Sequence, residues 1–63
     1  MKLFDVVKLT QDLPQEGLKK GQQGTILEIF HEPHLAYEIE FCDEDGQTLA
    51  LLALQPDQIE SMN

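Results

Sequence analysis

The sequence predicts an all-β fold, a small five-stranded barrel with a long loop between its first two strands and a short helical turn before its last strand. Within residues 18–26, a turn that begins at Gly21 and ends at Gly24 leads directly into a β-branched strand. A short apolar strand lies upstream, and an Asp45-Gly46 turn of the kind that closes hairpins lies downstream. At 63 residues the chain is predicted to be one domain, residues 1–63, near the lower size limit for independent folding.

Charge and cysteine content narrow the classes of partner and compartment. The net charge is −8, from 12 acidic and 4 basic residues, so the field of the protein repels nucleic acids and anionic membranes. We therefore expect neither as a partner. The single cysteine rules out an internal disulfide and suits a reducing compartment, and no apolar run has the length of a signal or membrane segment. The expected location is the cytoplasm.

The first strand and the loop after it are defined by composition. Residues 4–9 are mostly apolar and predict a strand, whereas residues 10–17 are polar and contain Pro14 and Gly17, which predict a loop. A helix in this loop is limited to a single turn by those two residues. Leu13 and Leu18 are expected to fold back onto one end of the barrel.

Residues 24–30 and 36–41 predict the clearest hairpin. With residues 31–35 as the loop, Phe30 faces Ala36 and Glu28 faces Glu38. The same register predicts three pairs on the buried face, which are Thr25 with Phe41, Leu27 with Ile39, and Ile29 with Tyr37.

The opposite face of this hairpin is predicted to combine apolar and acidic side chains. Carboxylates that face each other across strands repel mildly. They are either screened by solvent, or they form an acidic stripe that docks a partner rich in Lys or Arg. The residues on this face are Ile26, Glu28, Phe30, Ala36, Glu38 and Glu40.

Residues 48–54 predict a strand that is apolar on both faces, which is unusual for an antiparallel strand exposed to solvent. Either Leu49 and Leu51 or Leu52 and Leu54 must point away from the barrel interior. The expected cover is the loop that contains Leu13, or a second copy of the chain. Residues 56–59 then predict a short helical turn that begins with a proline, and residues 60–62 a last short strand.

Five segments of the chain carry a resemblance to known proteins, and these are residues 3–9, 12–14, 17–26, 37–41 and 45–50. On these residues the sequence resembles SH3-like barrels of the KOW type, and more closely a family of very short, stand-alone bacterial proteins of unknown function. The resemblance covers residues 3 to about 59. It implies RNA or ribosome contact from the KOW side, and from the small-protein family one half of a two-component, antitoxin-like pair.

Catalytic motifs are not predicted. Gly21 and Gly24 lack the Lys-Ser/Thr pair and the helix that follow the glycines of a phosphate-binding loop. Cys42 lacks a neighbouring base and lies beside the acidic residue Asp43, which is the wrong setting for a nucleophile. We therefore predict that the protein is not an enzyme and has no cofactor.

Metal binding is predicted to be adventitious at most. His31 and His34 share a loop, but Cys42 lies at the far end of the following strand, roughly 25 Å away. Two histidines and Glu32 fall short of the three or four ligands that zinc takes. The acidic turn at residues 43–45 lacks the glycine and glutamate that a calcium loop needs.

The remaining hypothesis is a non-enzymatic protein-interaction module that binds a protein partner or a second copy of itself. The alternative is a KOW-like module that binds RNA or the ribosome. Exposed apolar groups bordered by charge are typical of an interface. The residues predicted to bind the partner are Ile26, Glu28, Phe30, Tyr37, Glu38, Glu40, Leu49, Leu51, Leu52 and Leu54.

Overall fold

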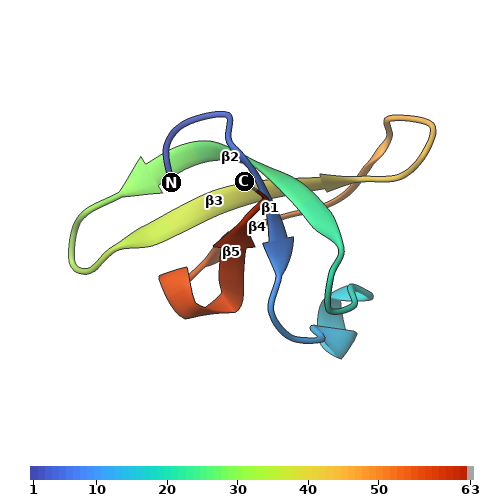
Figure 1. Cartoon of the computed structure of the whole chain (residues 1–63), viewed down its shortest axis with the longest axis horizontal. Coiled ribbons are helices and arrows are strands. Elements are labelled where there is room, and N and C mark those ends of the chain that lie inside the picture. The colour runs from blue at the N-terminus through green and yellow to red at the C-terminus, as the bar shows by residue number, and fades with distance from the viewer. Residues whose placement is uncertain (63) are drawn as a thin grey trace.

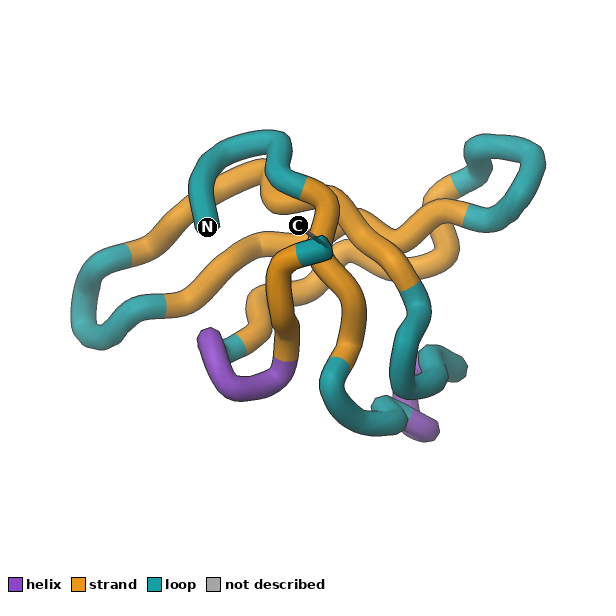
Figure 2. Tube along the Cα trace, viewed as in Figure 1, coloured by secondary structure: helices purple, strands orange, loops and turns teal. Residues whose placement is uncertain are grey.

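Five antiparallel strands form one sheet in the order β4-β3-β2-β1-β5 (Figure 1). The computed structural model describes residues 1–62. Apart from two single-turn 3-10 helices, strands and loops make up the described chain (Figure 2). The elements are β1 (Val6–Leu9), η1 (Pro14–Glu16), β2 (Gln23–Phe30), β3 (Ala36–Cys42), β4 (Thr48–Leu54), η2 (Pro56–Gln58) and β5 (Ile59–Ser61).

The predicted all-β class is confirmed, as are the five strands, the long loop after the first strand and the helical turn before the last. The sheet, however, is not closed into a barrel. β4 pairs only with β3, and β5 pairs only with β1, so these two strands are the free edges. All three residues of β5 pair with β1, and no pairing joins β5 to β4, so the last strand does not close the sheet.

The core lies against one face of the strongly twisted sheet. Alternate residues of each strand point into it, as the period of a β-strand requires. Leu18 joins it from the loop between β1 and β2, where Leu13 and Leu18 form an isolated bridge as the chain folds back. This part of the prediction is confirmed. The buried side chains are Val7, Leu9, Leu18, Ile26, Tyr37, Ile39, Phe41, Leu54 and Ile59.

The register between β2 and β3 agrees with the prediction only at the loop end. Glu28 pairs with Glu38, Ile29 with Tyr37, and Phe30 with Ala36. A bulge between Ile26 and Glu28 then shifts the pairing by one residue. The predicted pairs of Leu27 with Ile39 and of Thr25 with Phe41 are therefore wrong.

The bulge inverts the faces of the first half of β2. Ile26 pairs with Ile39 and is fully buried, while Thr25 pairs with Glu40. A bulge places two residues opposite one and increases the local twist. Ile26 thus fills the core position that the sequence assigned to Leu27.

Gly24 is buried near the start of β2 and lies close against side chains of β3. A Cβ built at this position would lie 2.5 Å from Cγ2 of Ile39 and 2.9 Å from Cε1 of Phe41. Its φ is not in the positive region, so space and not backbone conformation requires glycine here.

The chain before β1 forms a turn where the sequence predicts the start of a strand. Phe4 has a φ of 68°, and its side chain is 70% exposed. Its N–H donates to the carbonyl of Ile26 at 2.7 Å, and the N–H of Ile26 donates to the carbonyl of Asp5. These two hydrogen bonds hold an aromatic residue in a conformation that glycine normally adopts.

β4 places its leucines on two faces, as predicted. Leu54 is buried and Leu52 partly buried against the core, whereas Leu49 and Leu51 are 51% and 54% exposed. A second bulge, where β3 pairs with the start of β4, leaves Leu49 without a pair. The loop that contains Leu13 covers the inner pair, and the outer pair has no cover within the described chain.

Candidate functional site

Carboxylates and exposed leucines lie side by side on the outer face of the sheet, where Glu28 is exposed and Glu38 and Glu40 are half-buried. We call the carboxylates Glu28, Glu38 and Glu40 the acidic row, and we call Leu49 and Leu51 the leucine edge. Glu40 pairs with Leu51, so the acidic row borders the leucine edge directly. The acidic row lies on β2 and β3 and the leucine edge lies on β4, and β3 runs along the length of the molecule in Figure 1.

One hydrogen bond ties the acidic row to the edge strand. The hydroxyl of Thr48 donates to Oε2 of Glu40 at 2.8 Å. This contact holds the Glu40 carboxylate beside Leu49 and Leu51. The charge therefore has a defined position next to the exposed apolar surface, and its second oxygen remains available to a partner.

Charge is distributed unevenly over the outer face. Lys8 on β1 forms an ion pair with Glu60 on β5, with Nζ and Oε1 3.5 Å apart. Within residues 1–62, no cation forms an ion pair with a carboxylate of the acidic row. Because β1 and β5 lie at the other end of the sheet from β4, the region around the leucine edge is negative and not neutralised.

Four residues predicted to bind a partner are not on this surface. Ile26 is fully buried and Tyr37 is 6% exposed, so both belong to the core. The bulge moves Ile26 inward, and the pairing of Tyr37 with Ile29 places its ring on the inner face. Leu52 and Leu54 also point inward, which settles the choice between the two leucine pairs. The predicted residues that remain on the surface are Glu28, Phe30, Glu38, Glu40, Leu49 and Leu51.

Val6 belongs to this surface, although the sequence assigned it no role. It is 46% exposed and pairs with Thr25, which in turn pairs with Glu40. One row across the sheet thus runs from Val6 through Thr25 and Glu40 to Leu51. The sequence contained a signal for this position, because successive residues of a strand point to opposite faces. If Val7 faces the core, Val6 must face outward.

A pocket lies on the inner side of β4. Leu13 and Pro14 from the start of η1 face Leu52 and Leu54 across a pocket of about 320 Å³. The remaining lining residues are Gln15, Glu16, Ala53 and Gln58. The sequence predicted that Leu13 folds back onto one end of the barrel but did not predict a pocket beside it.

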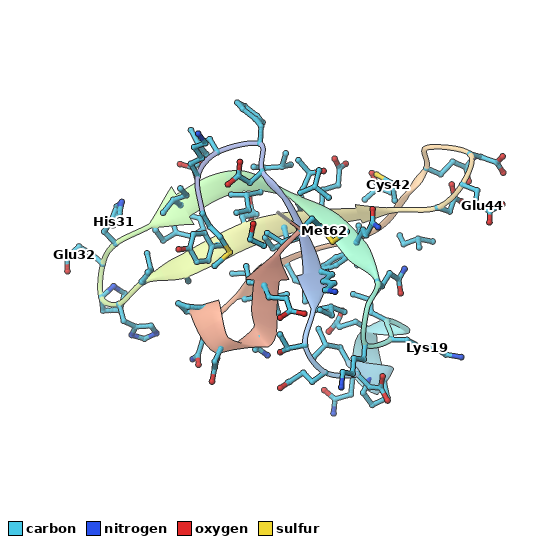
Figure 3. All side chains as sticks on the ribbon, viewed as in Figure 1. Lys19, His31, Glu32, Cys42, Glu44 and Met62 are labelled. Atoms are coloured by element: carbon cyan, nitrogen blue, oxygen red, sulfur yellow. The ribbon has the colours of Figure 1, made fainter. Side chains whose placement is uncertain are left out.

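The histidines and the cysteine lie apart, as the length of the strand between them predicts. Figure 3 shows His31 at one end of the long axis of the molecule and Cys42 toward the other. All three side chains are exposed. Over residues 1–62 no three His, Cys, Asp or Glu side chains form a group able to hold a metal ion.

Comparison with known proteins identifies a family. Among the described residues, no helix has both the length and the hydropathy needed to cross a membrane. Searches of curated proteins and of solved structures return no significant match. A family model described as a domain of unknown function (DUF4926) matches residues 3–61, so nearly the whole chain is covered. The chain therefore belongs to the DUF4926 family.

Proposed function

We propose that the protein is a non-enzymatic interaction module that binds a basic protein through the acidic row and the leucine edge. The observation behind this proposal is the exposure of Leu49 and Leu51 directly beside Glu40. Exposed apolar side chains bordered by charge are typical of protein-binding surfaces. The SH3-like resemblance fits a small adaptor of this kind.

The charge of the surface selects the partner. The acidic row has no cationic partner within the described chain, and the whole protein has a net charge of −8. A second copy would bring the same excess of negative charge, and RNA would bring phosphates. A protein segment with Lys or Arg beside apolar residues complements both the acidic row and the leucine edge. Opposite charges also increase the rate at which such a segment associates with this surface. Such a basic protein would be the other member of the two-component pair.

Site-specific photo-crosslinking in the source cells tests this proposal. A benzophenone amino acid replaces Leu51, and in a matched control it replaces Leu35, which is also an exposed leucine but lies in the loop between β2 and β3. We expect position 51, and not position 35, to form an adduct with one protein whose sequence contains a Lys/Arg-rich segment.

Charge variants complete the test. In the position-51 chain, Glu38→Gln combined with Glu40→Gln should remove the adduct, whereas Glu32→Gln combined with Glu44→Gln changes the net charge equally and should preserve it. Glu32 and Glu44 lie in loops at opposite ends of the molecule (Figure 3). An adduct that ribonuclease digests, an adduct that contains only this chain, or equal adducts at both positions would overturn the proposal.

A further inference from the structure

We propose that the partner binds by adding a strand to the free edge of β4, an inference that rests on the proposed function and specifies how the partner is held. β4 is a seven-residue edge strand of sequence Thr-Leu-Ala-Leu-Leu-Ala-Leu. Backbone groups on an unpaired edge are a template for another strand. No described residue outside β3 forms a backbone hydrogen bond with β4.

The edge of β4 lacks the features that normally prevent such pairing. Natural edge strands are kept short, or carry Lys, Pro or inward charges. β5, the other edge, follows this rule with three residues. β4 contains no charged residue, no proline and no glycine. An unprotected edge of this length, beside uncompensated carboxylates, indicates a surface that is covered when the protein is at work.

The inner side of the edge offers a place for an apolar side chain. The pocket of about 320 Å³ between η1 and β4 is lined by Leu13, Pro14, Leu52 and Leu54. Because alternate residues of a strand point to the same side, every second residue of an added strand faces this inner side. A Val, Ile or Leu at such a position enters the pocket.

The outer side offers a place for a basic side chain. Ala53 pairs with Glu38, and its methyl group leaves the space above it open. Strands are about 4.8 Å apart, so an added strand lies about 10 Å from β3. A Lys or Arg opposite Ala53 extends over the methyl group to the Glu38 carboxylate. A Lys or Arg opposite Leu51 packs its methylene groups on the leucine side chain and directs its charge toward Glu40.

The recognised segment therefore has a period of two, with apolar residues that point inward and basic residues that point outward. In strand addition, main-chain hydrogen bonds supply affinity and alternate side-chain sites supply specificity. A second copy of this chain does not meet the requirement, because β4 has no basic residue and each copy adds a charge of −8.

Peptide probes test the inference directly. The first probe is a short capped peptide in which Lys and Val alternate, and the second has the same composition with all lysines in one block. Two further probes have the alternating sequence with N-methylated backbone amides. One is methylated on the odd residues and the other on the even residues. A strand directs alternate N–H groups to its neighbour, so one methylated probe should lose at least about tenfold in affinity and the other should bind as the parent does.

Variants of the chain and amide exchange provide independent readouts. Ala53→Lys should weaken the alternating peptide by at least about tenfold, whereas the control Leu35→Lys, with the same change of charge, should alter affinity less than about twofold. Amide exchange of residues 48–54 should slow on binding of the alternating peptide, more than it does in the rest of the sheet.

The outcomes separate this inference from the proposed function. If the alternating peptide fails to bind, if the block peptide binds equally well, or if both methylated probes bind alike, strand addition is overturned. The proposed function still stands in each of these cases if position 51 cross-links to a basic protein. If the parent and only one methylated probe bind, and Ala53→Lys weakens them, strand addition is supported.

Discussion

Glu28 on β2 lies directly opposite Glu38 on β3, so two like charges face each other across the sheet. Neither has a cationic partner within the described residues. Replacing Glu28 with Lys converts a repulsive pair into an attractive one, and we expect the free energy of unfolding to rise by about 0.5–1 kcal/mol in urea titrations at low salt. Glu28→Gln should give an intermediate rise.

A loop position provides the control for this charge change. Glu32→Lys alters the net charge by the same amount, but Glu32 lies in the loop between β2 and β3 and has no opposite residue on a neighbouring strand. If Glu32→Lys stabilises the protein as much as Glu28→Lys does, the gain comes from net charge alone and not from the pair.

Gly24→Ala should destabilise the sheet. The added methyl group would meet Ile39 and Phe41 at distances shorter than van der Waals contact, and a carbonyl oxygen of β3 lies 3.0 Å away. We expect a loss of about 1–3 kcal/mol in the free energy of unfolding, measured by urea denaturation. Gln23→Ala, at the exposed neighbouring position, is the control and should change stability by less than about 0.5 kcal/mol.

Truncation of two leucines in β4 should reduce stability to very different extents. Leu54→Ala removes a side chain that is 4% exposed and should cost about 2–5 kcal/mol of unfolding free energy. Leu51→Ala removes one that is 54% exposed and should cost less than about 0.5 kcal/mol. Thermal and urea unfolding of both variants measure this contrast. A large loss with Leu51→Ala would show that the outer side of β4 supports the fold itself.

Phe4→Gly should be more stable than Phe4→Ala. Both variants remove the exposed ring, but only glycine adopts a φ of 68° without strain. The difference in unfolding free energy should be about 0.5–1 kcal/mol. Glycine removes the backbone strain at this position, but its greater conformational freedom in the unfolded chain offsets part of that gain. Equal stabilities would indicate that the turn changes its conformation in both variants.

The sequence was sufficient for the strand pattern but not for the bulge. Alternation and turn residues located the strands, because Gly24, Asp45 and Gly46 mark where the chain must turn or approach closely. Ile26 and Leu27 are both apolar, so either one could face the core, and nothing local distinguishes them. The choice depends on Phe4 and Asp5, whose hydrogen bonds to Ile26 exist only in the folded chain.

The candidate site, like the fold, could be predicted from the sequence only in part. That one pair of leucines must be exposed followed from a strand with more apolar side chains than one face can bury, but only the fold shows that the exposed pair is Leu49 and Leu51. The predicted register placed Tyr37 correctly on the buried face opposite Ile29. Its assignment to the partner-binding residues was wrong, since a tyrosine suits both a core and an interface. The pocket beside Pro14 was out of reach of sequence reasoning, because it depends on how far the loop after β1 folds under β4.

The pairing of β1 with β5 has a mechanical consequence. Val7 pairs with Ser61 and Leu9 pairs with Ile59, so the first and last strands run in opposite directions side by side. A pulling force applied at the two ends of the chain opens these pairs one after another, beginning at Val7 and Ser61. The hydrogen bonds between β1 and β5 therefore break in sequence and do not share the force. The sheet should therefore unzip at low force from this side, and β5 should be the first strand to detach.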